Sequence, residues 1–481
     1  MTKKGNLKSR TITGAIWLTL GKGIARSLDF IKLVVISHFL APADLGVFGI
    51  ALLVIGLVET FSETGFDLAL VQQQGKIEEY CRASWPVQIL RGCLLSLVIF
   101  FAAPVIADFF EHRELMSVIR LIGAVPLIRG FINPFVVFLT RDLNFKRLFL
   151  WNLLIEVTGT LVALGLLFFY RNIWPLAISL LSAQVLKTVT SYWIVKERPA
   201  LTWEWSKIKE LADFGQWIFG INIVVFFLIH GDDAWVGKIL GAAALGIYQV
   251  AFRIAAMPAT EISSIIASAT YPAFASLRNS PQILANSYLR IIQIVSCTAV
   301  PLSVAIYFII HDFTAVFMGP MWGPMAPVAQ ALCLYGMVRA INSPSGSIFL
   351  ALGKPKIETH LAVFQLILMA ALIYPFTVWW EITGVAAAIA LACLACFVWA
   401  CREVAKLVGQ STIKYYAEIF FSLAPGLFAG IILAALLWSL QNLVLVETSH
   451  LARFLTETAV ALSFIGGTGY WIYSQSRRHA T

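Results

Sequence analysis

The chain is short of charge and of polar connecting segments. Asp, Glu, Lys and Arg make up only 13% of its 481 residues, whereas 59% are hydrophobic and the mean hydropathy is +0.82. This composition excludes soluble globular and disordered chains and is typical of polytopic membrane proteins. The longest predicted turn, 196–210, is too short to hold a core of its own, which excludes a soluble catalytic domain.

Other signals are also missing. No glycine-rich phosphate-binding loop occurs, so direct use of ATP is not expected. The basic residues are dispersed among turns without a contiguous stripe, which argues against nucleic-acid binding despite the net charge of +9. Among the seven cysteines, Cys393, Cys396 and Cys401 lie close together in an apolar stretch that has no histidine or acidic companion. We expect them to pack, and we expect no metal and no cofactor.

About fourteen apolar runs have the length, roughly 20 residues, that is needed to cross about 30 Å of hydrocarbon. Backbone groups in lipid must be satisfied within their own segment, and the runs are too long for barrel strands. We therefore predict an all-α polytopic membrane protein. The predicted spans are 14–40, 44–70, 85–107, 115–139, 149–170, 173–195, 212–233, 243–270, 286–311, 326–350, 357–380, 382–404, 416–440 and 451–473.

The basic residues in the turns predict the orientation. Alternate turns lie on opposite sides of the membrane. The turns on one side contain 21 lysines and arginines, and those on the other side contain only Arg113, Arg171 and Lys238. The positive-inside rule then puts both termini in the cytoplasm. We also expect the first helix to be retained, because Lys22 and Arg26 interrupt its apolar stretch well before any signal-peptide cleavage site.

One internal repeat is visible. The segment 40–51, LAPADLGVFGIA, matches 240–251, LGAAALGIYQVA, without a gap at an offset of 200 residues, and Trp17 and Trp217 fall at the same offset. Both copies join an outward-running span to an inward-running one, which favours parallel repeats related by an axis along the membrane normal. We predict an N-terminal lobe of six helices (1–200), a C-terminal lobe of six helices (201–410) and two extra helices with a cytoplasmic tail (411–481).

Several predicted spans carry cations that hydrocarbon should reject. Each charge at the centre of a bilayer costs about 2.5–3.5 kcal/mol on insertion scales, so such residues should face water or a partner. Arginine forks suit phosphate and carboxylate groups. We predict a hydrated, mainly cationic cleft between the two lobes, with substrate-binding candidates Lys22, Arg26, Arg91, Arg253 and Arg339.

Acidic residues accompany these cations. Asp29 shares a helical face with Lys22 and Arg26, and Arg253, Met257 and Glu261 are predicted to form one stripe of a helix. The candidates for ion coupling or for charge pairing are Asp29, Glu59, Glu63, Asp232, Asp233 and Glu261. A purely structural role, in which Glu59 or Glu63 pairs with Lys22 or Arg26, remains an alternative, and Glu156 is expected to pair with Lys187.

Four segments carry a family resemblance. LAPADLGVFG (40–49), SETGFDLALVQ (62–72), LTRDLNFK (139–146) and YPAFASLR (271–278) resemble stretches of Wzx-type proteins of the polysaccharide-transport family. This family belongs to the multidrug/oligosaccharidyl-lipid/polysaccharide exporter superfamily. The resemblance extends over roughly residues 5 to 410, and RDLNFK (141–146) is its most specific piece.

The resemblance implies a flippase rather than an enzyme. It would translocate an undecaprenyl-pyrophosphate-linked oligosaccharide across the bacterial inner membrane by alternating access, for an O-antigen, a capsule or an exopolysaccharide. The expected partners are this lipid-linked oligosaccharide, membrane lipids and the polysaccharide polymerase machinery, and the protein is expected to be a monomer. Coupling to H⁺ or Na⁺ stays open.

Two alternatives come from other classes. A cation/drug antiporter of the same superfamily should favour an acidic, aromatic cavity, which the excess of lysine and arginine in the spans argues against. A membrane glycan polymerase should present a sizeable external loop, but the longest predicted outer turn is only about 312–326.

Overall fold

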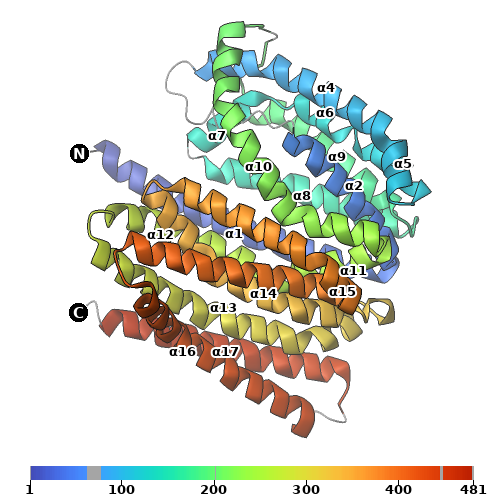
Figure 1. Cartoon of the computed structure of the whole chain (residues 1–481). Helices are drawn as coiled ribbons and strands as arrows, with labels where there is room; N and C mark the ends of the chain where they lie inside the picture. The colour runs from blue at the N-terminus through green and yellow to red at the C-terminus, as the bar shows by residue number, and fades with distance from the viewer. Residues whose placement is uncertain (1, 62–76, 143, 201, 445–447, 479–481) are drawn as a thin grey trace. The chain divides into compact units, whose positions relative to one another are not determined.

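The computed structural model of the protein describes residues 2–61, 77–142, 144–200, 202–444 and 448–478, and within these ranges all regular structure is helical (Figure 1). The first elements in chain order are α1 (Thr2–Phe39), α2 (Pro42–Phe61), α4 (Ile77–Phe109), α5 (Arg113–Ile122), α6 (Val125–Gly130), η1 (Pro134–Val136), α7 (Val137–Arg141), α8 (Phe145–Leu167), α9 (Trp174–Ile194), α10 (Trp205–Ile239) and α11 (Ala242–Ala255). The remaining elements are η2 (Pro258–Ile262), α12 (Ser263–Ser276), α13 (Pro281–Phe317), η3 (Pro320–Trp322), α14 (Met325–Ala351), α15 (Pro355–Leu407), α16 (Thr412–Ser439), η4 (Leu440–Val444) and α17 (His450–Arg478).

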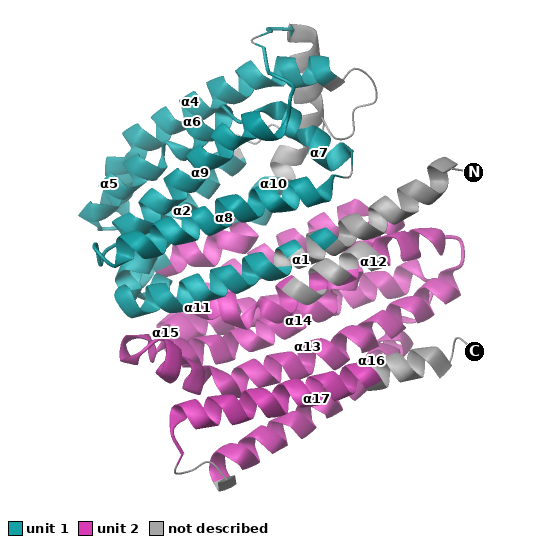
Figure 2. Ribbon diagram, turned by 180° about the vertical axis from the view of Figure 1, so that it is seen from behind, with its two compact units in different colours: residues 1–226, 237–246 teal, residues 227–236, 247–481 magenta. Residues whose placement is uncertain are grey.

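The chain forms two compact units (Figure 2). Unit 1 comprises residues 1–226 and 237–246, and unit 2 comprises residues 227–236 and 247–481. In unit 1, α8 packs against α1 and α9, and α4 packs against α5 and α6. In unit 2, α13 packs against α14, α16 and α17, and α14 packs against α15. The predicted division into two six-helix lobes and two extra helices stays a prediction.

Six helices in the described part of the chain are long and apolar enough to cross a membrane, or seven if one bent pair counts as a span. They differ in how deeply they are packed. In α4, α8 and α16, only 22% of the most apolar stretch of 18 residues is buried within the protein, whereas 67% of the corresponding stretch of α15 is buried. The first three helices therefore present apolar faces for lipid, and α15 is a core helix. The protein is a multi-pass membrane protein, and the count of fourteen spans stays a prediction.

The two neighbouring spans predicted at 357–380 and 382–404 both lie within α15. Helical geometry is broken there at Trp380 and at Glu381, which has a positive φ of 49°. Just beyond this break, a Cβ atom on Gly384 would lie 1.9 Å from the carbonyl oxygen of Phe376, so only glycine fits. The boundary that the sequence predicts between these two spans therefore coincides with the break in helical geometry inside α15.

Two predicted spans are not continuous helices, contrary to the sequence prediction. The span 115–139 is divided among α5, α6, η1 and α7, and it bends by 70° between Gly130 and Pro134. Asn133 precedes a proline, which disfavours helical backbone, and its side chain caps the next turn by accepting a hydrogen bond from Phe135 N at 3.0 Å. Local side-chain chemistry outweighs the apolar pattern here.

The span 243–270 is interrupted by a π-helical turn, η2, which begins at Pro258. Proline cannot donate the hydrogen bond that would continue α11, and a π-turn shifts the angular position of every residue after it. Arg253 precedes this change of geometry in α11, and Glu261 lies within the π-turn itself. The predicted single regular α-helix through Arg253, Met257 and Glu261 is therefore wrong, and the stripe itself stays a prediction because the side chain of Glu261 lies outside the described residues.

The two copies of the internal repeat meet within unit 1. A Cβ atom on Gly46 would lie 1.7 Å from the carbonyl oxygen of Ala242, and one on Gly246 would lie 2.0 Å from that of Pro42. Residue 242 corresponds to residue 42 at the offset of 200, so the two contacts are equivalent. Helices α2 and α11 therefore cross backbone to backbone at matching glycines, which only residues without a side chain permit.

We expect Gly46→Val and Gly246→Val to destabilise the protein by more than about 1–3 kcal/mol, because the added atoms collide with backbone that cannot move aside. Thermal unfolding of the purified protein in detergent measures this. Gly165→Ala is the control, since its Cβ would meet nothing within 4 Å. Equal unfolding temperatures for Gly46→Val and the wild type would contradict the close crossing.

Candidate functional site

In unit 1, a lysine on α1 is held between two carboxylates. Lys32 Nζ lies 3.0 Å from Asp29 Oδ1 and 3.0 Å from Glu156 Oε1, which α8 contributes. Glu156 therefore contacts Lys32, whereas the Lys187 ammonium lies over the ring of Trp151, at 5.8 Å from its centroid. Of the predicted cations on this helix, Arg26 is exposed, and the side chain of Lys22 lies outside the described part of the structure.

A second group in unit 1 forms around the end of α2. Arg129 Nη1 on α6 donates to Glu59 Oε2 at 2.8 Å, and Arg91 Nη2 on α4 donates to the backbone carbonyl of Glu59 at 3.1 Å. Two predicted residues, Glu59 and Arg91, are thus brought together. Arg129 was not among the candidates, although it lies in a predicted span and its charge was a signal that could have identified it. Glu63 lies outside the described residues.

In unit 2, a buried carboxylate lies near the end of α10. Asp232 is 3% exposed, and its Oδ2 accepts a hydrogen bond of 2.5 Å from the hydroxyl of Tyr248 on α11. Its other oxygen, Oδ1, is buried with no hydrogen-bond partner in the described part of the chain. Asp233 follows directly and lies 3.5 Å from His230 Nδ1. A carboxylate that is only half satisfied in apolar surroundings is a strong attractor for a proton or a cation.

Aromatic rings connect this carboxylate with an arginine. The ring centroid of Tyr248 lies 6.2 Å from that of Phe252, which lies 5.3 Å from that of Tyr335 on α14. The guanidinium of Arg339, one turn further along α14, lies 5.8 Å from the Tyr335 centroid. We call Asp232, Tyr248, Phe252, Tyr335 and Arg339 the Asp232 network. It combines an acid with a cation among buried aromatic rings.

The tyrosines of this network were missed from the sequence. Tyr248 falls within the internal repeat, where its counterpart is Phe48, so the hydroxyl group that distinguishes the two copies was the available signal. The other predicted residues of unit 2 are less informative. Arg253 is exposed and has no partner among the described residues, and the side chain of Glu261 is outside them.

Comparisons with known proteins identify relatives along most of the chain. The sequence profile of the polysaccharide biosynthesis protein family matches residues 35–327. The chain is 22% identical to the lipopolysaccharide biosynthesis protein WzxC of Escherichia coli K12 over 366 residues, which are 75% of this chain and 74% of WzxC.

Solved structures share the fold. The lipid II flippase MurJ, in an inward closed conformation, superimposes with a TM-score of 0.77 at 14% identity, over 96% of this chain and 99% of that one. A multidrug resistance transporter of the MATE family, in an inward-facing conformation, gives a TM-score of 0.62 at 16% identity, over 83% of this chain and 99% of that one. At these identities the likeness concerns the fold alone.

We expect Tyr248→Phe to lower the free energy of unfolding by about 1–3 kcal/mol, because the buried Asp232 carboxylate loses its hydrogen-bond donor. The same substitution should cost less in an Asp232→Asn background, where the group left behind is neutral. Thermal unfolding in detergent measures both effects. The matched control is Tyr307→Phe, at a half-exposed tyrosine of α13. If Tyr248→Phe and Tyr307→Phe have the same unfolding temperature, the hydrogen bond between Tyr248 and Asp232 does not contribute to stability.

Proposed function

The chain belongs to the polysaccharide biosynthesis protein family, and we propose that it is a flippase for an undecaprenyl-pyrophosphate-linked oligosaccharide. The cargo would cross the inner membrane of a bacterium, from the cytoplasmic to the periplasmic leaflet, to be built into an O-antigen, a capsule or an exopolysaccharide. The observation that supports this proposal most strongly is the match to WzxC along three quarters of both chains, since that protein is named for lipopolysaccharide biosynthesis. The fold shared with MurJ, a lipid II flippase, supports a lipid-linked cargo.

The physical problem in this function is the head group. A pyrophosphate with several sugars is charged and heavily hydrated, and moving it through bare hydrocarbon would cost many kcal/mol. A wet path lined by cations removes most of that barrier, and the polyprenyl tail can stay in lipid. Guanidinium groups suit the task because they bind phosphate oxygens with two parallel hydrogen bonds.

The candidate cations differ in how available they are. Arg253 is exposed and lacks a partner among the described residues, so its donors can serve a ligand. Arg339 lies half-buried over Tyr335, with which it also forms a side-chain hydrogen bond, and its guanidinium has further donors for a ligand. Arg91 already donates one hydrogen bond to the backbone carbonyl of Glu59, so fewer of its donors are available. We therefore assign the main contacts with the pyrophosphate to Arg253 and Arg339, with Arg26, Lys22 and Arg91 as further contacts.

The driving ion would act at the Asp232 network. Asp232 has one oxygen bound by Tyr248 and the other unsatisfied, and the adjacent Asp233 adds negative charge. A proton or Na⁺ bound there would remove a charge from the interior and change the field around Tyr335 and Arg339. This is how we propose that ion binding is coupled to alternating access. No covalent chemistry is needed, so the protein would be a transporter and not an enzyme.

The remaining features follow the same proposal. The asymmetry of basic residues favours cytoplasmic termini. The protein would work as a monomer that hands its cargo to the polysaccharide polymerase machinery on the far side of the membrane.

A cation/drug antiporter is the second candidate. The shared fold with the MATE transporter and the acidic pair Asp232–Asp233 favour it, while the arginines in the spans favour an anionic cargo.

A deletion strain separates these two functions. We expect the strain to lose a surface polysaccharide and to accumulate its lipid-linked repeat unit on the cytoplasmic side, with unchanged tolerance to cationic drugs. Gel analysis of the polysaccharide and drug inhibition curves measure these outcomes. Normal polysaccharide with increased drug sensitivity would favour the antiporter.

Substitution of the arginines tests the proposed path. Arg253→Ala and Arg339→Ala should each lower polysaccharide export by about 10- to 100-fold, the loss expected for a hydrogen-bonded contact with a charged group. Membrane levels of the protein should not change. Arg171→Ala is the matched control, because Arg171 is an exposed arginine in a turn beside Phe39. Export at wild-type levels in both variants would exclude these arginines from the path.

A further inference from the structure

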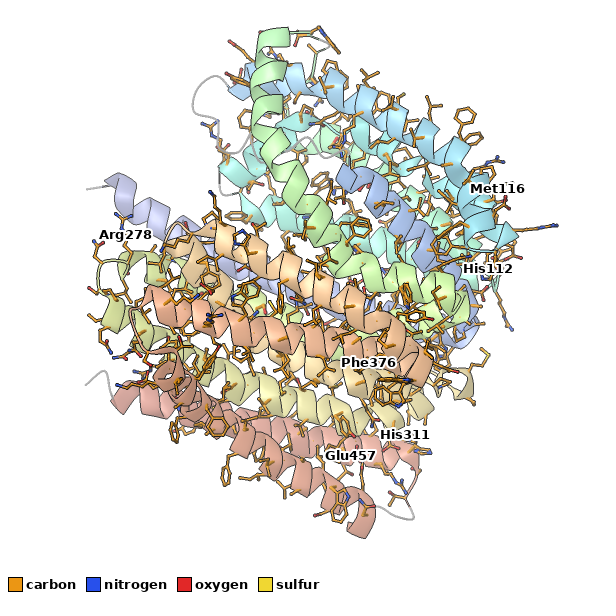
Figure 3. All side chains as sticks on the ribbon, viewed as in Figure 1. His112, Met116, Arg278, His311, Phe376 and Glu457 are labelled. Carbon is orange, nitrogen blue, oxygen red and sulfur yellow. The ribbon has the colours of Figure 1, made fainter. Side chains whose placement is uncertain are left out.

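Two histidines and an aspartate meet where α13 ends and α17 begins, in unit 2. His311 and Asp312 belong to the last turns of α13, and His450 is the first residue of α17. His450 Nδ1 lies 2.5 Å from Asp312 Oδ1, and His311 Nδ1 lies 4.0 Å from the same oxygen. One ligand atom from each residue lies within 4.8 Å of the others. Figure 3 labels His311, and Glu457 near it on α17.

The packing of the two helices holds these residues together. Beside Asp312, the ring centroid of Phe313 lies 6.1 Å from that of Phe454 on α17, and the centroid of Phe317 lies 4.9 Å from it. The aromatic contacts fix the distance between α13 and α17 independently of the three polar residues. These contacts therefore hold side by side the helix segments that carry the three residues.

One residue of the cluster is buried in the protein, and the other two are exposed to solvent. The side chain of Asp312 is only 4% exposed, whereas those of His311 and His450 are 69% and 51% exposed. A buried carboxylate thus forms the base, and two imidazoles form a rim that an ion can reach from solution. Under the predicted topology this end of the helices lies on the non-cytoplasmic side.

The donor set is that of a transition-metal site. Two imidazoles and one carboxylate are ligands that Zn²⁺ prefers, and three protein ligands leave a fourth position for water. Bonds of about 2.0–2.2 Å in a tetrahedron set neighbouring ligand atoms about 3.4 Å apart. His450 and Asp312 would have to separate slightly and His311 to approach slightly. Both histidines are exposed enough to turn.

The charge around the cluster also favours a cation. Glu457 stands seven residues after His450, two turns along the same face of α17. It is fully buried, a side-chain hydrogen bond with Gln441 acts on its carboxyl group, and it interacts electrostatically with Asp312. Arg453 is the cation that acts on Glu457. A second carboxyl group so close to Asp312 favours a cation over an anion at the cluster.

We propose that His311, Asp312 and His450 bind one divalent transition-metal ion of the Zn²⁺ class, which ties the start of α17 to the end of α13. The site goes beyond the transport function and does not depend on it. It also departs from the expectation of no metal, which rested on the cysteines, because residues 138 positions apart become neighbours only in the fold.

Titration calorimetry with ZnCl₂ tests this on the purified full-length protein in detergent, without a histidine tag and after treatment with a chelator. We expect one Zn²⁺ per chain with micromolar affinity. His311→Ala should weaken binding at least tenfold, and it should fold normally because the side chain of His311 is 69% exposed and its contacts with Asp312 and the ring of His450 are long, at 4.0 Å and 5.9 Å between centroids. His360→Ala, at an exposed histidine of α15, should bind Zn²⁺ as the wild type does.

A second measurement separates the metal site from a plain hydrogen bond. His450→Asn keeps a donor for Asp312 but removes a good Zn²⁺ ligand. Zn²⁺ at a concentration about ten times the wild-type Kd should therefore raise the Tm of the wild type by several degrees and raise those of His450→Asn and His311→Ala clearly less, with Mg²⁺ inactive on all three. The proposal is overturned if the wild type binds no Zn²⁺, or if His311→Ala binds it as tightly as the wild type.

Discussion

A polar group in hydrocarbon needs a partner, and the charged residues of this protein follow that constraint. Asp232 takes a hydrogen bond from Tyr248, Glu59 takes one from Arg129, and Lys32 lies between Asp29 and Glu156. Three of these contacts, Asp232–Tyr248, Glu59–Arg129 and Lys32–Glu156, join different helices, so they also hold the helices in register. Asp232 Oδ1 is one of the buried polar atoms without a hydrogen-bond partner among the described residues, and the proposed ion coupling rests on it.

The same constraint links the fold to the proposed transport. Apolar faces of α4, α8 and α16 can meet lipid, while Arg253 and Arg339 lie on helices α11 and α14, which also carry Tyr248 and Tyr335. An anionic head group would exchange its water for guanidinium donors and would never enter hydrocarbon. Membership in a polysaccharide biosynthesis family and a MurJ-like fold agree with such a cargo.

Much of the helical structure could be predicted from the apolar runs, because a run of about 20 residues in lipid has no alternative to a helix. The predicted boundary at 380–382 is an example, since it coincides with the break at Trp380 and Glu381. The predictions were wrong at Asn133–Pro134 and at Pro258, where a proline outweighs a continuous apolar pattern. For the site, charge in a span identified Asp232, Glu59 and Arg91. Their partners Tyr248 and Arg129 could not be deduced, because pairing across helices depends on how the helices pack.

The sequence alone therefore determined the class of protein, the approximate helical segments, the repeat and the family, because composition and periodicity are properties of neighbouring residues. Tertiary structure decided which residues meet. Gly46 and Gly246 are alike in the sequence, but only the crossing of α2 and α11 explains why both must be glycine. Likewise, His450 becomes a neighbour of Asp312 only because Phe313, Phe317 and Phe454 pack α17 against α13. Contacts between distant segments are set by packing, which no local pattern encodes.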